Sequence, residues 1–388
     1  MALGRLELST VEKFAIVSYN MYCNFTNYGS ALQQYALHRI INELAPERLE
    51  AIVLNYCPDV LIDKDVLNPY KNMWDQDPVS KLMVDLSMPA IKTNYEKFKK
   101  FFKEQYNLSK QKYTSDNFNE SLNEECLDGY VCGSDTIWCI QEFGGFDDGF
   151  FGNFPAMKES HTISYAASFG DASFKGDDVQ TLKNRLNNFK AIGIRESTYL
   201  DFIKENVHEI PIQTVVDPTL LLTKDDYEAI TASRQIDEPY VLLYARRYNK
   251  AMEEYTDRLA ERMGWRVVEI SLRATNSEKH IMKYDAGIEE FLSLVKNAEF
   301  VVSNSYHGAI FSIIMHTEFA VFSREQADTK IDELLGWLGL DDRKFVTGEE
   351  SISEKIDFDV IDSIIGGKRA VALAYLRSAL IENRNVTG

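Results

Sequence analysis

The segment at residues 303–309, Ser-Asn-Ser-Tyr-His-Gly-Ala, combines residue types that could bind an anion and move a proton. It lies between two apolar runs, at 300–302 and 310–315, which is the pattern of a strand, a polar turn and a helix. The N-terminus of a helix attracts anions because its N–H groups are unpaired and its dipole is positive there. His307 in this turn would stand where open α/β sheets bind ligands, and its ordinary pKa lies near neutrality. The alternative is a polar turn with a structural histidine.

Length and charge indicate the class of protein that contains this turn. The chain has 388 residues, which favours two domains, and its 45% hydrophobic and 12% aromatic content indicates a globular protein. The formal net charge of −18 argues against nucleic acid as a partner, because a phosphate backbone needs a basic surface. A small anionic ligand is compatible with this charge, since a local group of arginines can override the field of the whole protein.

The sequence also predicts where the protein works. It contains no run of 18 apolar residues and begins without an apolar signal segment, so we expect neither a transmembrane segment nor secretion. The five cysteines, an odd number without C-x-x-C spacing, indicate reduced thiols. Cys132 and Cys139 are expected to be buried small residues, and no metal site is expected. The expected location is the cytoplasm; peripheral contact with the inner face of the membrane and the oligomeric state stay open.

The first part of the chain has the pattern of a βαβ unit, which is typical of a parallel sheet. Apolar strands at 14–18 and 51–54 flank a predicted helix with apolar residues at helical spacing. Residues 59–90 look irregular, and a further helix is expected over 94–106. Asp217, which precedes a proline, is expected to be a structural turn residue that closes this part. Short strands between these segments are predicted at 130–132, 162–165 and 191–194.

The second part repeats the alternation of strands and helices after a polar linker at 223–238. A final helix over 359–382 is expected to pack back across one of the domains. The predicted fold class is α/β, with two Rossmann-like domains that face a cleft in a glycosyltransferase-B-like arrangement. We expect these domains at 12–222 and 239–345, followed by a helical tail at 346–388.

Six short motifs follow one another over about residues 14–325. The motifs are NYGSALQQYAL at 27–37, GSDTIW at 133–138, SYAASFG at 164–170, GIRES at 193–197, DPTLLL at 217–222 and SYHGA at 305–309. Together and in this order they resemble the polysaccharide pyruvyl transferases, a family of enzymes with a glycosyltransferase-B-like pair of Rossmann-type domains. Each motif alone would be a weak signal, whereas the combination is specific.

The resemblance implies a reaction. Enzymes of this family use phosphoenolpyruvate as donor, bridge two hydroxyls of a sugar with pyruvate as a cyclic ketal, and release phosphate. The implied acceptor is a sugar of a cell-surface polysaccharide or its precursor, polymeric or lipid-linked, and no cofactor is implied. This sequence departs from the family where well-studied members carry Arg-Leu-His, because Ser305 stands in the place of the arginine. That arginine is thought to help hold the donor, and our hypothesis is that Arg246 and Arg247 supply the missing charge.

The resemblance also suggests roles for single residues. His307 is expected to act as acid or base or to hold the phosphate. Arg195 is expected to bind the donor carboxylate, unless it pairs with Glu196 instead. Asp135 is expected to position or deprotonate a sugar hydroxyl, unless it caps a helix, and Trp138 either stacks on a sugar or fills the core. The other residues expected to contact substrate are Asn27, Gly29, Ser30, Ser134, Ser305, Gly308 and Ala309, the last two through backbone amides that would bind phosphate oxygens.

Two other functions stay open at this point. A nucleotide-sugar glycosyltransferase can have the same two-domain fold, and it would bind UDP, GDP or CMP sugars in the C-terminal domain. A non-catalytic member of the family could have lost the donor arginine, which would explain Ser305. The presence of both His307 and Arg195 argues against this second alternative.

Overall fold

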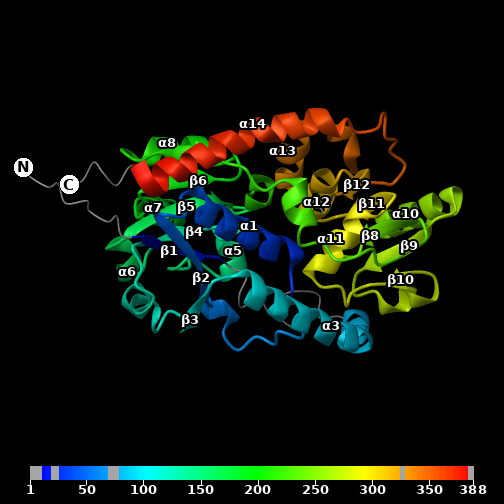
Figure 1. Cartoon of the computed structure of the whole chain (residues 1–388), viewed down its shortest axis with the longest axis horizontal. Helices are drawn as coiled ribbons and strands as arrows, with labels where there is room; N and C mark the ends of the chain where they lie inside the picture. Colours follow the sequence, from blue (N-terminus) through cyan, green and yellow to red (C-terminus); the bar gives the residue numbers. More distant parts are fainter. Residues whose placement is uncertain (1–10, 19–25, 69–77, 324–327, 383–388) are drawn as a thin grey trace, which may run out of the picture.

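Two parallel β-sheets, each connected through helices, build the chain in the computed structural model (Figure 1). The structure describes residues 11–18, 26–68, 78–323 and 328–382. The first sheet has the strand order β3-β2-β1-β4-β5-β6-β7, and the second has the order β10-β9-β8-β11-β12-β13. All neighbouring strands in these sheets are parallel. The predicted α/β fold with two Rossmann-like sheets is therefore confirmed.

The strands are short, and the helices connect one strand to the next. The first sheet consists of β1 (Glu12–Val17), β2 (Leu49–Tyr56), β3 (Leu108–Tyr113), β4 (Gly129–Cys132), β5 (His161–Ala167), β6 (Ala191–Ile194) and β7 (Ile212–Thr214). The second consists of β8 (Tyr240–Tyr244), β9 (Arg266–Ile270), β10 (Ile281–Met282), β11 (Phe300–Ser303), β12 (Phe319–Phe322) and β13 (Lys344–Phe345). The helices of the first domain are α1 (Tyr28–Leu44), α3 (Pro78–Gln105), α4 (Ser121–Glu124), α5 (Ile140–Phe143), α6 (Pro155–Lys158), α7 (Asp177–Leu186) and α8 (Leu200–Asn206). Those that follow are α9 (Lys224–Glu228), α10 (Lys250–Met263), α11 (Ile288–Lys296), α12 (Tyr306–Met315), α13 (Asp328–Leu338) and α14 (Phe358–Arg377).

Both faces of the first sheet are buried. Along β1, Phe14 and Ile16 point into one apolar core, whereas Ala15 and Val17 point into another on the opposite face. Successive side chains of a strand alternate between faces, so a sheet covered on both sides needs continuous apolar strands. This explains why the strands of this chain were recognisable as short apolar runs rather than as alternating patterns.

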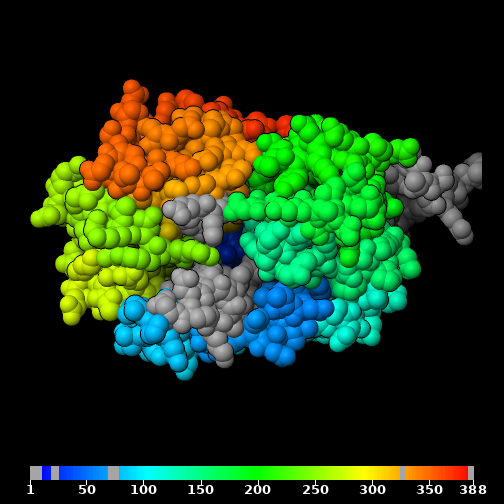
Figure 2. All heavy atoms as spheres, turned by 180° about the vertical axis from the view of Figure 1, so that it is seen from behind, coloured from blue at the N-terminus to red at the C-terminus, as the bar shows by residue number. Residues whose placement is uncertain are grey.

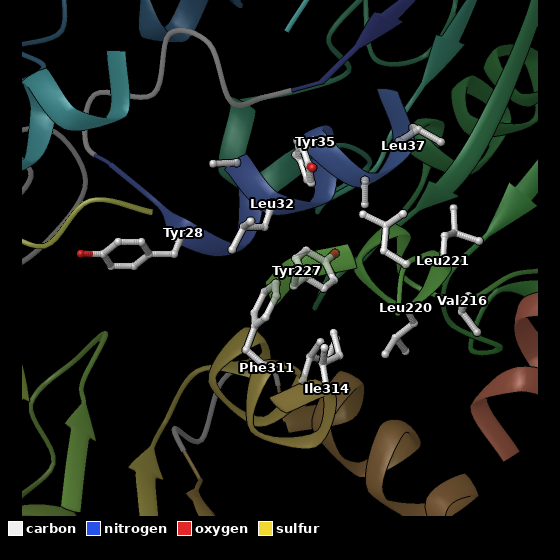
Figure 3. Packing of buried hydrophobic residues seen from close by; sticks show 14 of the residues in the cluster. Tyr28, Leu32, Tyr35, Leu37, Val216, Leu220, Leu221, Tyr227, Phe311 and Ile314 are labelled. Carbon is white, nitrogen blue, oxygen red and sulfur yellow. The ribbon is translucent and has the colours of Figure 1, made fainter. Parts of the chain in front are cut away.

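An apolar interface joins the two domains through helix α1 (Figure 3). The ring of Tyr28 stacks on Phe291 of α11, with ring centroids 4.4 Å apart. Further along α1, Tyr35 packs near Tyr227, whose ring meets the edge of Phe311 in α12. Side chains of both domains therefore share one core, which determines how the two halves of the candidate site meet.

Helix α3 starts earlier than the sequence indicated, so the expectation of irregular structure over 59–90 is wrong for its last part. Pro89 lies inside the helix, although a proline removes one backbone hydrogen bond there. Val84 and Ile91, on either side of this proline, pack together with Leu272 of the second domain. This contact with the second domain keeps both parts of the helix in place. The local sequence does not reveal it, because Leu272 is distant along the chain.

Helix α14 crosses both domains (Figure 1). At its start in the second domain, Phe358 stacks on the ring of His316 with centroids 4.8 Å apart. Towards its end, the hydroxyl of Tyr375 donates a hydrogen bond to the carbonyl of Ser164 in the first domain at 2.7 Å. The helix therefore connects the second domain back to the first.

Atoms of the early part of the chain are visible between the two domains on the face seen in Figure 2. The carboxyl ends of the central strands lie at this junction of the domains. Within the described ranges, no helix is long and apolar enough to cross a membrane.

Candidate functional site

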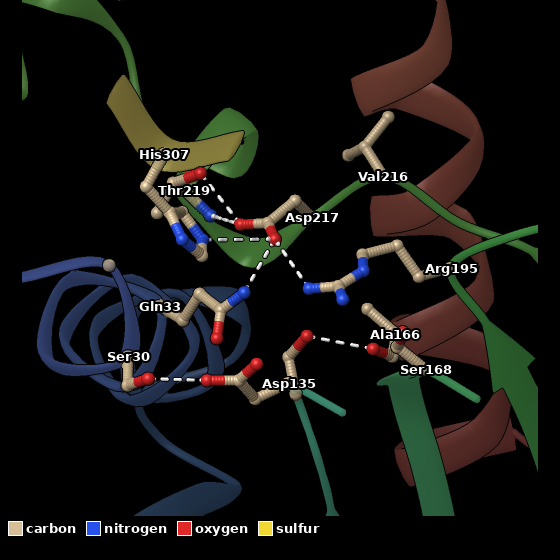
Figure 4. A network of polar contacts seen from close by, with 12 residues as sticks. Ser30, Gln33, Asp135, Ala166, Ser168, Arg195, Val216, Asp217, Thr219 and His307 are labelled. Carbon is tan, nitrogen blue, oxygen red and sulfur yellow. Dashed lines mark hydrogen bonds and ion pairs between the residues drawn. The ribbon is translucent and has the colours of Figure 1, made fainter. Parts of the chain in front are cut away.

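The carboxyl ends of strands from both sheets meet at a group of polar side chains (Figure 4). Asp135 follows β4, Arg195 follows β6 and Asp217 follows β7. His307 comes from the second sheet, in the first turn of α12 after β11. Parallel strands present their carboxyl ends at the same edge, so residues far apart in sequence come together there. The interdomain cluster, as we name this group, consists of Ser30, Gln33, Asp135, Arg195, Glu196, Asp217 and His307.

Asp217 is the centre of the interdomain cluster. Its Oδ2 atom accepts hydrogen bonds from Gln33 Nε2 at 2.6 Å and from Arg195 Nη1 at 3.0 Å. The same oxygen lies 3.4 Å from His307 Nε2, an ion-pair distance. Its Oδ1 atom accepts hydrogen bonds from the amide and the hydroxyl of Thr219 at 3.0 and 2.7 Å. The fully buried carboxylate is therefore connected to groups of both domains.

These contacts determine the protonation states of Asp217 and Arg195. Burial alone would raise the pKa of Asp217, but the positive charges of His307 and Arg195 outweigh burial and hold that pKa well below its usual range. Burial would lower the pKa of Arg195, but the carboxylates of Glu196 and Asp217 raise it above its usual value. At neutral pH the cluster therefore contains an ionised Asp217 and a charged Arg195.

Arg195 uses two of its three nitrogens within the cluster. Its Nε donates to Glu196 Oε1 at 2.9 Å, and its Nη1 donates to Asp217, so the expected pairing with Glu196 is present. The hydroxyl of Ser168 donates to the same Glu196 oxygen. Four buried atoms of the cluster have no hydrogen-bond partner among the described residues, namely Arg195 Nη2, Glu196 Oε2, Gln33 Oε1 and His307 Nε2. Buried polar atoms without partners are costly, so these atoms mark a place suited to the polar groups of a ligand.

The ring of His307 is held by close packing against the first domain. A Cβ atom at residue 29 would overlap the His307 ring at Nδ1, Cγ and Cε1, so only glycine leaves room for the ring. The side chain of His307 is 11% exposed, and its Nε2 faces Asp217. Helix α1 and Asp217 therefore position the imidazole from two sides.

Asp135 adds a second carboxylate to the cluster. Its φ of +83° lies in the left-handed region, which is rare for a residue other than glycine and often occurs at functional sites. The amide of Thr136 donates to its Oδ1 at 2.8 Å, and the hydroxyl of Ser30 donates to its Oδ2. Burial would raise the pKa of Asp135, but the nearby charges of Arg195 and Lys330 contribute to lowering it. Asp135 is therefore ionised at neutral pH and available as a proton acceptor.

A cavity of about 280 Å³ opens beside the cluster. Arg195, Asp217 and Tyr306 line the side that faces the cluster. The other side includes Gln213, Glu333, Trp337 and Lys368. Apolar and aromatic side chains with a few polar groups are the usual composition of a small-molecule site. No group of three or more His, Cys, Asp or Glu side chains in the described part of the chain could hold a metal ion.

The structure brings the residues predicted as catalytic together: Asp135, Arg195 and His307 all belong to the interdomain cluster. Gly29 and Ser30 contact its members, as described above. Asn27 instead caps helix α1, because its side chain accepts hydrogen bonds from the amides of Gly29 and Ser30 at 3.1 and 3.4 Å. The hydroxyl of Ser134 donates to the carbonyl of Ala166 at 2.7 Å and is therefore engaged within the protein.

The start of helix α12 differs from the expected anion site. The amide of Ala309 donates to the carbonyl of Ser305 at 3.1 Å, so the prediction that this amide binds phosphate is wrong. A Cβ atom at residue 308 would overlap Ser303 Oγ, so Gly308 serves close packing inside the second domain. The amide of Ser305 donates to the same hydroxyl at 3.0 Å. The amides of Ser305 and Ala309 are therefore both engaged within the second domain.

Trp138 lies in the core of the first domain. Its side chain is 0% exposed, and its Nε1 donates to the carbonyl of Phe150 at 3.0 Å. Its ring packs on those of Phe151 and Phe169. The assignment of Trp138 as a substrate-binding residue is therefore corrected to the core alternative, because a ring without exposed surface cannot stack on a sugar.

Arg246 and Arg247 line a separate pocket at the carboxyl ends of β8 and β9. The side chain of Asn304 fixes their loop, since it accepts from the amide of Arg246 at 2.9 Å and donates to the carbonyl of Arg247 at 2.7 Å. This pocket shares no lining residue with the interdomain cluster. The placement does not support the hypothesis that these two residues replace the donor arginine.

Sequence reasoning missed three residues in or beside the interdomain cluster. Asp217 was assigned to a structural turn, and it does begin one, but its carboxylate is also the centre of the cluster. Gln33 lies one helical turn after Ser30 on α1, and this spacing could have revealed it. Lys330, on α13, belongs to none of the six motifs, so no signal pointed to it.

Solved structures of similar fold include two nucleotide-sugar epimerases. A putative UDP-N-acetylglucosamine 2-epimerase from Listeria monocytogenes aligns with a TM-score of 0.53 and 11% identity, over 95% of this chain and 96% of that chain. The UDP-GlcNAc 2-epimerase from Methanocaldococcus jannaschii aligns with a TM-score of 0.48 and 13% identity, over 91% and 92% of the two chains. At such identity the first of these likenesses establishes the fold alone, a glycosyltransferase-B-like pair of domains. No curated protein matches the chain.

A comparison with family models gives a more specific result. The model described as polysaccharide pyruvyl transferase matches residues 27–326, which is most of the chain. All six motifs and the whole interdomain cluster lie within this range. The chain therefore belongs to the polysaccharide pyruvyl transferase family.

Proposed function

We propose that this chain is a cytoplasmic enzyme that transfers the pyruvyl group of phosphoenolpyruvate to a sugar of a cell-surface polysaccharide or its precursor. The product is a cyclic pyruvate ketal, and phosphate is released. The observation that supports this proposal best is the interdomain cluster, where Arg195 and His307 meet the carboxylates of Asp135 and Asp217. Such a donor needs cations for its carboxylate and phosphate, and the ketal chemistry needs groups that give and accept protons.

The reaction requires two C–O bonds to form and one to break. The methylene carbon of the donor gains a proton and becomes a methyl group, while the first sugar hydroxyl adds to the neighbouring carbon and loses its proton. The second hydroxyl then bonds to the same carbon as the bond from that carbon to the phosphate oxygen breaks. The proton of the second hydroxyl leaves with the phosphate. One donor and two hydroxyls thus give one ketal and one hydrogen phosphate.

The residues of the cluster are suited to these steps. His307 can donate the proton to the methylene carbon, because an imidazole can give and accept a proton and Asp217, 3.4 Å from its Nε2, helps to hold the ring in place. Asp135 can accept the proton of the first hydroxyl, because its lowered pKa keeps it ionised at neutral pH. Arg195 can bind the donor through Nη2, the nitrogen that no other described residue engages.

The cavity beside the cluster is the proposed place of the acceptor. Trp337 offers an aromatic surface, and Gln213 and Glu333 offer polar groups within the same cavity. A sugar combines apolar C–H faces with hydroxyls, so this combination of side chains fits it. From here the acceptor would reach Arg195 and Asp217 directly, since both line the same cavity.

Turnover tests this proposal. The purified protein is incubated with phosphoenolpyruvate and a panel of sugars and polysaccharide precursors, and phosphate release and the methyl signal of the ketal in proton NMR are followed. We expect both signals with at least one acceptor, and their loss in H307A without a change in thermal unfolding. Transfer from a UDP, GDP or CMP sugar without phosphoenolpyruvate would instead establish a glycosyltransferase and contradict the proposal.

A further inference from the structure

Lys330 brings a further cation to the interdomain cluster from helix α13. Its Nζ lies 5.8 Å from the centroid of the Tyr306 ring. The Cζ of Arg195 lies 5.2 Å from the centroid of the same ring. Tyr306 immediately precedes His307, so the ammonium and the guanidinium are gathered around the residue next to the proposed proton donor.

Among the residues that the structure describes, none is a direct counter-ion of the Lys330 ammonium. Within the described part of the chain it makes no hydrogen bond and no ion pair within 4.0 Å, whereas Lys344, which contacts the same helix, pairs with Asp328 and Asp332. Burial and then the charge of Arg195 lower the pKa of Lys330. A partly buried cation beside a second cation is unfavourable in the free protein, so a bound anion would relieve it.

The charge balance of the cluster also favours a role of Lys330 in binding an anion. Its carboxylates are Asp135, Glu196 and Asp217, and Arg195 with a protonated His307 supplies only two positive charges. An anionic donor would therefore meet net negative charge if no other cation were present. Lys330 supplies the third positive charge, and its field reaches Asp135, whose pKa it contributes to lowering.

We propose that Lys330 Nζ and Arg195 Nη2 together form an anion subsite that binds the phosphate or the carboxylate of the donor. The identification of that anion as phosphoenolpyruvate rests on the proposed function. Arg195 is 7% exposed, and its Nη2 is buried without a partner and points away from Asp217 (Figure 4). In this arrangement Lys330, rather than Arg246 or Arg247, compensates for Ser305 at the position of the family's arginine.

Calorimetric titration tests the subsite with three probes: phosphoenolpyruvate, inorganic phosphate and pyruvate. The variants are K330Q, K330R and, as a matched control, K250Q, which removes a lysine with a 75% exposed side chain on α10. We expect K330Q to weaken phosphoenolpyruvate binding by roughly 10- to 100-fold, the usual effect of losing a hydrogen bond to a charged group. K330R should keep most of the affinity, and K250Q should equal the wild type.

The small probes identify the bound group. Weaker phosphate binding in K330Q assigns Lys330 to the phosphate, and weaker pyruvate binding assigns it to the carboxylate. Wild-type affinity of K330Q for all three probes would overturn the subsite, and so would a wild-type protein that binds none of them. A wild-type protein that binds phosphate or pyruvate but not phosphoenolpyruvate contradicts the proposed function. In that case weaker binding of phosphate or pyruvate by K330Q would still support the subsite, and unchanged binding would overturn it.

Stability separates a binding role from a structural one. Lys330 has no partner among the described residues that a neutral side chain would leave unsatisfied, so the ligand-free K330M variant should unfold at the wild-type temperature or above it. A lower unfolding temperature for K330M, together with unchanged phosphate and pyruvate binding, would show that Lys330 serves only the fold and would overturn the proposal.

Discussion

The imidazole of His307 in the second domain packs directly against Gly29 in the first turn of α1 in the first domain. A methyl group at residue 29 would occupy the space of the ring. Asp217 contacts the same ring from another side, so the position of His307 depends on how the two domains meet. The shared apolar core around Tyr28 and Phe291 fixes that arrangement.

Replacement of Gly29 by alanine should therefore disable the site. The added Cβ must push the His307 ring away from Asp217, and displacements of about 1 Å can reduce activity about 100-fold. Overpacking should also lower the free energy of unfolding by about 1–3 kcal/mol. Steady-state kinetics and urea denaturation measure the two effects.

The control is Gly367→Ala in α14, where a Cβ meets nothing within 4 Å. This change should leave kcat/KM unchanged and raise the free energy of unfolding by about 0.5–1 kcal/mol, because alanine favours the helix. Wild-type kcat/KM in G29A would refute the positioning of His307 by this contact.

Asp217→Asn should remove part of the acid sensitivity of the protein. The folded pKa of Asp217 lies below its value in the unfolded chain, about 3.9. Asp217 therefore contributes stability above that value, and the contribution is lost as the pH falls below it. At pH 7 the variant should be less stable by about 3–5 kcal/mol, since Arg195 loses a buried partner. The difference in free energy of unfolding between the two proteins should be nearly equal at pH 7 and 4 and smaller at pH 3; an undiminished difference at pH 3 would contradict this.

His280 should make the free energy of unfolding decline as the pH rises above about 6.5. Burial would lower its pKa, but carboxylates on both ring nitrogens, Glu269 at 2.6 Å and Asp257 at 2.8 Å, raise it above its ordinary value. A raised folded pKa stabilises the protein fully below the unfolded value of about 6.5, and this stabilisation is lost as the pH rises through the folded pKa. Chemical denaturation at a series of pH values from below about 6.5 upwards should show a falling free energy of unfolding in the wild type and in H208Q, a control at an exposed histidine. The H280Q variant should lack this fall. The same decline in H280Q would rule out His280 as its source.

Trp138→Phe should affect the fold rather than the acceptor. The change removes the hydrogen bond to the carbonyl of Phe150 and part of the core volume, at a cost of about 1–3 kcal/mol. The KM for the acceptor should stay at the wild-type value. Trp337→Ala, in the cavity beside the cluster, should instead raise that KM. An increased acceptor KM in W138F at unchanged stability would restore the sugar-stacking alternative.

The fold was predictable because both sheets are covered on both faces. Short apolar runs such as 300–302 stand out from polar turns, and the helix after each turn shows its apolar spacing. The same local pattern could not reveal that α3 continues through Pro89, because a contact with the distant Leu272 stabilises it there.

The site was predictable only where a motif ends a strand. His307, Arg195 and Asp135 stand within four residues of the ends of strands, and the parallel sheets bring them together. Asp217 carries two functions, since it starts a turn and also holds Arg195, and the sequence reveals only the first. Lys330 reaches the cluster from a helix late in the chain, and only the tertiary structure places a helix residue there.

Binding of phosphoenolpyruvate at the interdomain cluster is tested most directly by thermal unfolding of the wild type and H307A with phosphoenolpyruvate, UDP, GDP or CMP. Phosphoenolpyruvate at about 100 times its dissociation constant should stabilise the wild type by roughly 2.7 kcal/mol. We predict a clear shift with phosphoenolpyruvate alone and a smaller one in H307A. No shift with phosphoenolpyruvate, or a shift only with a nucleotide, would contradict the proposed function.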